Sequence, residues 1–170
     1  MRVLALLAAV PPILFGAVPG RVAGWQRYGN GWAVAYLHGG AKGPCGYLER
    51  GTWRVALVST SPLPVHLTVD RAVERSMCGN TFEWIRAGAL TDGRHREVAV
   101  SITATPSLGA DAFVYRLERN RLRLLRRFHA DRVAIRPGVV TLTWAYAARS
   151  PSGEAREVWR WRRGRYLKTK

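Results

Sequence analysis

Acidic residues, lysine and cysteine are all scarce in this chain of 170 residues. Only 11 Asp and Glu stand against 27 Lys and Arg, so the formal net charge is +16, which attracts polyanions and repels cationic partners. Only three of the basic residues are Lys, so Arg carries nearly all of the positive charge. The two Cys form no C-x-x-C pair and no paired His accompanies them, which excludes the usual four-ligand zinc site.

Recognisable catalytic motifs are also missing. The chain has no G-x-S-x-G nucleophile elbow, no H-E-x-x-H and no P-loop order of residues. No pair of carboxylates indicates glycosidase chemistry, and the four His are isolated from one another in sequence, at His38, His66, His95 and His129. We therefore predict a protein without enzymatic activity, catalytic residues, cofactor or metal. An enzyme whose site is assembled from residues far apart in sequence remains the alternative.

The one long uncharged run lies at the N-terminus and is typical of an export signal. Arg2 precedes an uncharged stretch over residues 3–18, and small residues end the segment before Trp25. We predict that residues 1–24 are a signal peptide and that the protein is extracellular, cell-surface or periplasmic; a cut after Gly20 also fits the pattern. The uncharged run is interrupted by Pro and, at about 16 residues, is short for a membrane span. An uncleaved N-terminal membrane anchor is the alternative.

Export makes a disulfide between Cys45 and Cys78 chemically possible. The bond closes a loop of about 34 residues and stabilises the fold by about 3–4 kcal/mol on the chain-entropy model. We predict that the two residues pair. Two reduced thiols are the alternative.

Strand signals dominate the chain after residue 25, and helix signals are scarce. Seven Trp and six Tyr favour half-buried sheet surfaces. The best helix candidate, residues 69–77, is short and weak. Segments of alternating or apolar character, separated by Gly, Pro, Asn and Asp, predict antiparallel meandering strands near residues 32–37, 52–58, 65–69, 82–85, 97–104, 112–117, 122–128, 139–147 and 157–161.

Three segments share one pattern, an apolar alternation on each side of a Gly or Asn. They are residues 48–55, 117–124 and 161–168, with Gly51, Asn120 and Gly164 at the shared position. Gly and Asn accept the positive φ that a tight turn requires, so the pattern predicts β-hairpins of one type. Residues 25–34, around Gly29-Asn30-Gly31, indicate a fourth and less regular hairpin.

The last two hairpins lie 44 residues apart, and the same offset places Val98, Val100 and Ile102 on Leu142, Trp144 and Tyr146. A four-strand period of about 40–45 residues is typical of a propeller blade. We predict one all-β domain over residues 25–170, with two related units near 92–124 and 136–168. Because the chain is too short for an ordinary propeller, we expect a partial propeller-like array of antiparallel hairpin sheets, with a two-sheet β-sandwich as the alternative.

Residues 90–100, Leu-Thr-Asp-Gly-Arg-His-Arg-Glu-Val-Ala-Val, resemble the core of the VCBS or FG-GAP-type repeat, D-x-x-G-D-G-x-x-E followed by alternating apolar residues. The resemblance extends over residues 92–128 and, more weakly, over 136–168. It implies an extracellular β-propeller-type architecture and no particular activity. The family's acidic, calcium-holding loop is reduced to Asp92 and the later Glu97, amid basic neighbours, so no calcium site is expected here.

Arg clusters are the strongest functional signal. Period two places Arg160 and Arg162 on one face of a strand, and Arg121 and Arg123 likewise share a face. If the two hairpins are neighbours, these faces merge into one stripe that binds phosphates or carboxylates through forked hydrogen bonds. The candidate polyanion-binding residues are Arg116, Arg119, Arg121, Arg123, Arg126, Arg127, Arg160, Arg162, Arg163 and Arg165.

The partner expected for this stripe is an anionic polymer or a membrane or wall surface. A secreted nucleic-acid-binding protein is the alternative. A third interpretation is that the Arg residues form an ordinary solvated face that binds no partner. The Trp residues are expected in the core rather than on a platform for base stacking. The sequence indicates no small-molecule ligand and no oligomeric state.

Overall fold

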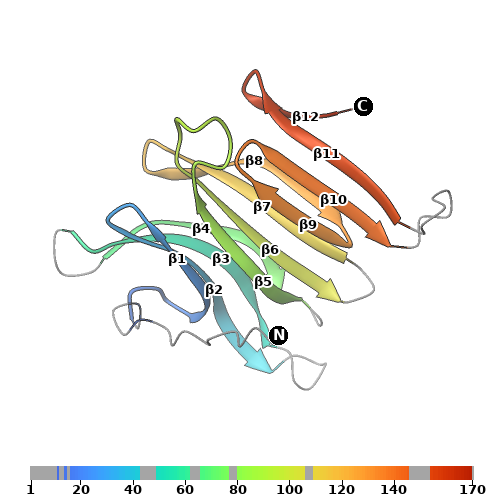
Figure 1. Ribbon diagram of the computed structural model, residues 1–170. Coiled ribbons are helices and arrows are strands. Elements are labelled where there is room, and N and C mark those ends of the chain that lie inside the picture. Colours follow the sequence, from blue (N-terminus) through green and yellow to red (C-terminus); the bar gives the residue numbers. More distant parts are fainter. Residues whose placement is uncertain are drawn as a thin grey trace, which may run out of the picture.

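Twelve β-strands make up the secondary structure of the described part of the chain (Figure 1). The computed structural model describes residues 11, 14, 16–42, 49–61, 66–76, 80–105, 109–145 and 154–169. The strands are β1 (Arg21–Tyr28), β2 (Gly31–Lys42), β3 (Glu49–Ser59), β4 (His66–Ser76), β5 (Thr81–Gly88), β6 (Glu97–Thr105), β7 (Gly109–Glu118), β8 (Arg121–Ala130), β9 (Arg132–Arg136), β10 (Val139–Ala145), β11 (Glu154–Arg162) and β12 (Arg165–Lys168).

The strands form three antiparallel sheets, each a meander of four consecutive strands. Sheet A contains β1–β4, sheet B contains β5–β8 and sheet C contains β9–β12. The all-β prediction is confirmed. The weak helix candidate at residues 69–77 was wrong, because residues up to Ser76 belong to β4 and pair with β3. The described residues form three sheets, whereas the alternative of a β-sandwich has two. The propeller-like character stays a prediction.

Sheet B lies between the other two sheets, and its middle strands β6 and β7 are buried on both faces (Figure 1). Strand β7 shows why, since all eight residues of its sequence Gly-Ala-Asp-Ala-Phe-Val-Tyr-Arg are buried and six of them are uncharged and apolar or small. Phe113 and Tyr115 pack in the core between sheets A and B, whereas Ala112 and Val114 pack in the core between sheets B and C. A strand covered on both faces has apolar residues on both and not only at every second position, and its two buried charged residues, Asp111 and Arg116, are each held in an ion pair.

Two hairpin turns have the geometry that the sequence pattern predicts. Between β7 and β8, Arg119 and Asn120 have φ of 44° and 62°, and between β11 and β12, Arg163 and Gly164 have φ of 50° and 76°. Positive φ at both central residues defines the type I′ turn, whose twist matches that of paired strands. The predicted hairpins around Asn120 and Gly164, at residues 117–124 and 161–168, are confirmed.

The third predicted hairpin was wrong, because Gly51 lies inside strand β3. A Cβ atom at this position would lie 2.6 Å from the carbonyl oxygen of Gly39 and 2.7 Å from that of His38. The pairing of β2 with β3 shifts register between His38 and Ala41, directly beside this contact. Glycine is needed here so that a bulged neighbouring strand can approach closely, and not for a turn.

The 44-residue offset relates three of the four strands in sheets B and C. It places β6, β7 and β8 on β10, β11 and β12, which hold the same places in their sheets. The first strands differ, because residues 89–96 connect β5 to β6, whereas only Pro137-Gly138 connects β9 to β10. A common origin of the two units stays a prediction.

The predicted export signal lies only partly within the described residues. Leu14 and Val18 are buried against the outer face of sheet A, and residues 16–20 lead into β1. Cys45 and Cys78 lie outside the described residues, so their pairing stays a prediction. In the described part of the chain, no helix has the length and apolar character needed to cross a membrane.

The burial of four tyrosine side chains predicts that the folded protein loses stability at alkaline pH. Burial raises the pKa of Tyr28 and Tyr36 to about 12, and it raises the pKa of Tyr115 and Tyr166 further above the usual range. Unfolded tyrosine ionises near pH 10, so above about pH 10 the unfolded chain releases protons that the folded chain keeps. The free energy of unfolding is therefore expected to fall as the pH rises from about 10 to 12.

Absorbance at 295 nm and urea midpoints measured over this range check the expectation. Tyrosine ionisation that is complete near pH 10, with an unchanged urea midpoint, would contradict it.

Candidate polyanion-binding face

Sheet C covers sheet B with one face, and its other face carries a group of exposed Arg side chains. The strand β9 shows the alternation, because Val133 and Ile135 are buried while Arg132 and Arg136 are exposed. The same phase continues across the sheet. We call the outward-facing set the outer face of sheet C: Arg132, Ala134, Arg136, Val139, Thr141, Thr143, Glu154, Arg156, Val158, Arg160, Arg162, Arg165 and Leu167.

Strand register arranges four of these Arg residues as a rectangle. Thr143 on β10 pairs with Arg132 on one side and with Arg156 on the other. Val139 pairs in the same way with Arg136 and Arg160. Two strand spacings separate the members of each pair by about 10 Å, and four residues along a strand correspond to about 13 Å. The four side chains surround a shallow hollow of about 580 Å³ whose floor carries Thr141 and Thr143.

The positive charge of this rectangle has little compensation. Glu154 is the one acidic residue among those that line the hollow. Ion pairs within the described residues engage Arg54, Arg116, Arg123 and Arg127, and none of them involves an Arg of the outer face of sheet C. Arg162 and Arg165 are even directly opposite each other on β11 and β12. Like charges placed directly opposite each other destabilise a sheet, so folding stability does not account for this arrangement.

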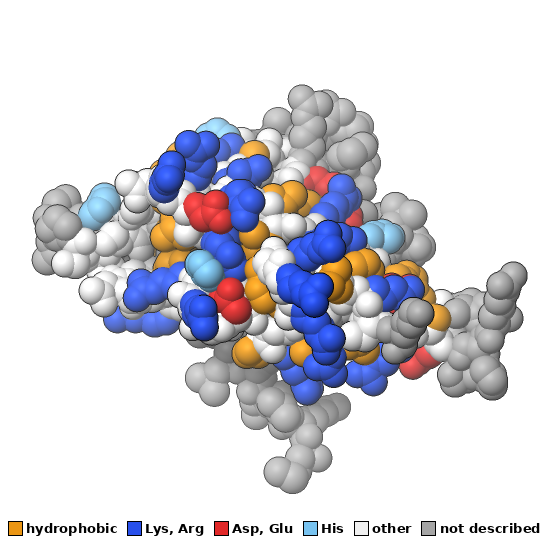
Figure 2. Space-filling view, turned by 90° about the horizontal axis from the view of Figure 1, so that it is seen from above, with side chains coloured by type: hydrophobic (Ala, Val, Ile, Leu, Met, Phe, Trp, Pro, Cys, Tyr) orange, Lys and Arg blue, Asp and Glu red, His pale blue; other side chains and the backbone are white. Residues whose placement is uncertain are grey.

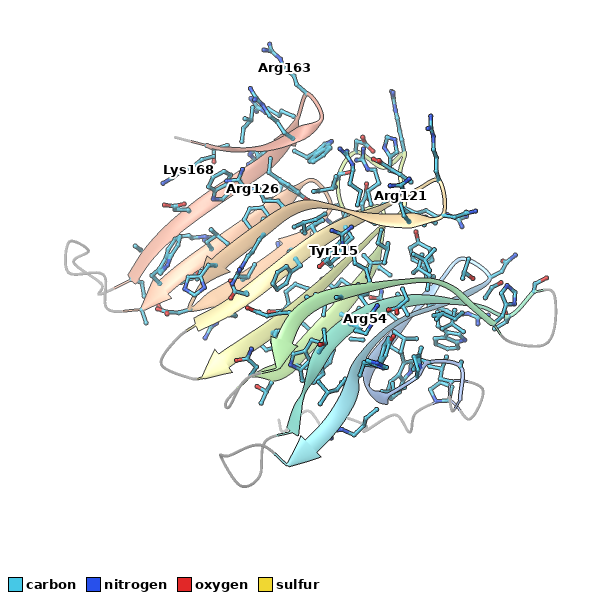
Figure 3. The ribbon with its side chains drawn as sticks, turned by 180° about the vertical axis from the view of Figure 1, so that it is seen from behind. Arg54, Tyr115, Arg121, Arg126, Arg163 and Lys168 are labelled. Carbon is cyan, nitrogen blue, oxygen red and sulfur yellow. The ribbon has the colours of Figure 1, made fainter. Side chains whose placement is uncertain are left out.

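The ten Arg residues predicted from sequence fall into three different settings. Arg160, Arg162 and Arg165 lie on the outer face of sheet C, and Arg163 lies at the tip of the β11–β12 hairpin (Figure 3). A second group lies at the β7–β8 hairpin, where Arg119, Arg121 and Arg123 line a hollow with Arg71 and Glu118. The two hairpins belong to different sheets, so their Arg residues do not form one continuous sheet face.

The other three predicted residues have partners inside the protein. Arg116 is only 8% exposed and belongs to a buried ion pair. The Arg126 guanidinium lies 4.6 Å from the ring centroid of Trp159, and Arg127 makes two hydrogen bonds to Asp111, at 3.0 and 2.7 Å. Viewed from above, Lys and Arg side chains are spread over much of the surface, with few acidic ones among them (Figure 2).

Sequence reasoning missed Arg132 and Arg136 as candidate site residues. The signal was present in Arg-Val-Ala-Ile-Arg at residues 132–136, which has the same period-two alternation as residues 158–162. Strand pairing was the missing information. Only the register of β10 between β9 and β11 shows that these Arg residues share a face with Arg160.

A buried ionic centre, formed by Glu97 and Arg116, anchors the loop between β5 and β6. The Glu97 carboxylate is fully buried and accepts hydrogen bonds from the Leu90 backbone N–H at 2.9 Å and from the Thr91 hydroxyl at 2.6 Å. Its third partner is the Arg116 guanidinium, whose Nε lies 3.1 Å and whose Nη2 lies 3.0 Å from Oε1. The guanidinium also lies 5.0 Å from the centroid of Trp161, which connects this centre to sheet C.

Asp92 and His95 lie at the solvent side of the same centre. His95 Nδ1 lies 3.0 Å from Asp92 Oδ1, and this hydrogen bond lowers the pKa of Asp92 below its usual range. Ligand atoms of Asp92, His95 and Glu97 lie within 4.8 Å of one another, as in a metal site. Arg116 Nη2, however, lies 3.0 Å from Glu97 and 3.8 Å from Asp92. The guanidinium thus supplies the positive charge that a metal ion would bring, and a metal would have to compete with it.

Comparisons with family models, with curated proteins and with solved structures found no match to this chain. The resemblance of residues 92–128 to the VCBS or FG-GAP-type repeat therefore stays a prediction.

The buried ion pair predicts a large loss of stability for Glu97→Gln. The substitution leaves the Arg116 guanidinium, whose side chain is 10% exposed, without its carboxylate. Removing one partner of a buried pair costs about 3–5 kcal/mol, which urea denaturation measures. The control is Glu118→Gln, which removes the exposed ion pair with Arg123 and is expected to cost less than about 1 kcal/mol. Equal losses for the two variants would show that the centre at Glu97 contributes no more than a surface pair.

Proposed function

We propose that this chain is an exported, non-enzymatic β protein that binds an anionic polymer or surface through the outer face of sheet C. The observation that carries the proposal is the rectangle of Arg132, Arg136, Arg156 and Arg160, with no ion-pair partner for any of the four among the described residues. Each guanidinium presents a planar set of donors that matches a phosphate or carboxylate.

The shape of the face favours an extended ligand. Its cationic groups are distributed over about 10 by 13 Å of sheet and do not converge on one point. A polymer or a surface that carries repeated negative charges contacts several of them together. Release of its counterions then adds to the affinity.

The position of the Trp residues favours other polyanions over single-stranded nucleic acid. Trp144, Trp159 and Trp161 point to the inner side of sheet C, where they pack against the core shared with sheet B. The outer face carries Thr, Val and Ala between its Arg residues and offers no aromatic ring on which a base could stack. A nucleic-acid-binding protein remains the second candidate, supported by the charge alone.

Export is part of the proposal. The two possible cleavage sites of the signal peptide differ in how much of β1, which begins at Arg21, they leave in the mature protein. A cut after Gly24 removes the first four residues of β1, including Val22, which pairs with Tyr36. A cut after Gly20 leaves the whole of β1.

Mass spectrometry of the protein isolated from its native host tests this part of the proposal. The expected mass corresponds to a chain that begins at Arg21 or Trp25. Recovery of the intact chain from Met1 in the soluble cytoplasmic fraction would contradict export.

Replacing the rectangle tests the binding function. We expect the quadruple variant Arg132→Gln, Arg136→Gln, Arg156→Gln and Arg160→Gln to bind heparin more weakly and with a flatter dependence on salt. For nucleic acid, each phosphate contact contributes about 0.7–0.9 to the slope of log affinity against log salt, so the loss of four contacts lowers the slope for DNA by about 3. Heparin is also a linear polyanion, so its slope is expected to change in the same direction. The variant should remain folded, because exposed sheet positions usually cost under about 0.5 kcal/mol each.

The matched control removes the same charge elsewhere. Arg27, Arg71, Arg86 and Arg94 are all exposed and are not among the candidate polyanion-binding residues, and replacing the four by Gln lowers the net charge equally. If both variants lose affinity equally, net charge and not the outer face of sheet C determines binding. If the rectangle variant binds heparin, duplex DNA and anionic vesicles as the parent does, the face is only solvated. A clear preference of the parent for DNA at matched salt would favour the nucleic-acid alternative.

A further inference from the structure

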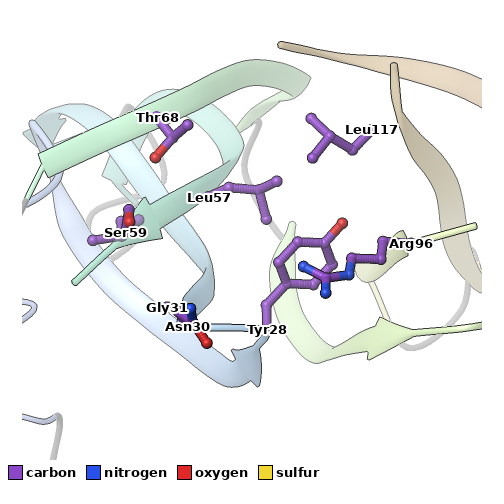
Figure 4. A pocket seen from close by; sticks show the side chains of 9 residues that line it. Tyr28, Asn30, Gly31, Leu57, Ser59, Thr68, Arg96 and Leu117 are labelled. Atoms are coloured by element: carbon purple, nitrogen blue, oxygen red, sulfur yellow. The ribbon is translucent and has the colours of Figure 1, made fainter. Parts of the chain in front are cut away.

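A second site lies between sheets A and B, away from the outer face of sheet C. It is a pocket of about 240 Å³ at the end of the A–B core where the β1–β2 turn lies (Figure 4). Its apolar part consists of Leu57, Val58 and Leu117. An engineered apolar cavity of about 150 Å³ in another protein holds one benzene ring, so this pocket has room for a ring and a small polar group.

Tyr28 brings an unpartnered hydroxyl group to the pocket. The residue ends β1, and its ring packs against the core cluster between sheets A and B. Its Oη atom is buried and has no hydrogen-bond partner among the described residues. Burial raises the pKa of Tyr28 to about 12, so the hydroxyl is protonated at neutral pH and available as a donor. A buried hydroxyl without a partner is costly in a folded protein, and a ligand atom in the pocket would satisfy it.

Arg96 brings positive charge to the same pocket, beside Tyr28 (Figure 4). Its charge acts on the Tyr28 hydroxyl and opposes the rise of that pKa. No ion pair within the described part of the chain involves the Arg96 guanidinium. A Cβ atom at Gly29 would lie 2.7 Å from Arg96 Nη1, so the glycine of the β1–β2 turn leaves the space that this guanidinium occupies.

We propose that this pocket binds a small organic anion, with the apolar body of the ligand against Leu57 and Leu117 and its carboxylate between Arg96 and the Tyr28 hydroxyl. Few polar groups at the mouth of an apolar cavity are typical of sites for small ligands. A charge-assisted hydrogen bond from Arg96 would orient the carboxylate, and Tyr28 would donate a second one.

Ligand-observed NMR and calorimetry on the full chain test the proposal, with benzoate as the probe and benzamide as a neutral ligand of the same shape. We expect Arg96→Gln to weaken benzoate binding about tenfold or more and to leave benzamide binding unchanged, because only the anion loses a charged partner. Tyr28→Phe removes the hydroxyl alone and is expected to weaken benzoate binding about fivefold. The matched control is Arg94→Gln, an exposed Arg in the same loop, which should change neither affinity.

Absence of benzoate binding to the parent chain would overturn the proposal, and so would an equal effect of Arg96→Gln on benzoate and benzamide. Circular dichroism and the thermal midpoint identify any variant that fails to fold, and Arg96→Lys then provides the test, since it keeps the charge and should retain most of the affinity. The outer face of sheet C shares no residue with this pocket, so failure at one site leaves the other proposal unaffected.

Discussion

Burial of the middle strands of sheet B on both faces is the constraint on which the other two sheets depend. Strand β7 can occupy the middle of the stack because its residues are mostly apolar on both sides and small on one of them, where Ala112 and Val114 lie in the B–C core. Sheets A and C each find their partner surface on sheet B, and neither core exists without it. The buried Glu97–Arg116 pair is part of the same arrangement, because the Arg116 side chain reaches from β7 of sheet B to the ring of Trp161 in sheet C.

Local sequence was sufficient to predict features that depend on one strand or one turn. The turns at Asn120 and Gly164 followed from residues that accept positive φ between apolar alternations. The same reasoning failed at Gly51, because glycine also serves where two backbones approach closely, and a sequence does not distinguish these uses. The stacking of three sheets was not predicted, since it depends on which faces meet, and alternation alone does not specify a partner.

The candidate site shows the same division between local and distant information. Alternation correctly placed Arg160 and Arg162 on one face, but Arg132 and Arg136 joined them only through the register of β10. Arg116 shows the opposite error, because its sequence neighbours suggest an exposed basic cluster while Glu97, distant by one strand and a turn, draws it into the core. The pocket at Tyr28 and Arg96 left no pattern in the sequence, since its residues come from five strands and two connections.

The two outer faces of the three-sheet stack have opposite character, and this limits how copies of the chain can associate. On the outer face of sheet A, a buried apolar patch at Val34, Tyr36, Ala56 and Val58 packs against Leu14 and Val18, which lie in the segment that export would remove. The outer face of sheet C, in contrast, is strongly cationic. Two copies that met through sheet C would bring two sets of uncompensated guanidinium groups together, at a cost of several repulsive contacts. Stacked β architectures need a polar terminal surface to stay soluble. Repulsion between Arg-lined faces therefore disfavours the stacking of a second copy on sheet C.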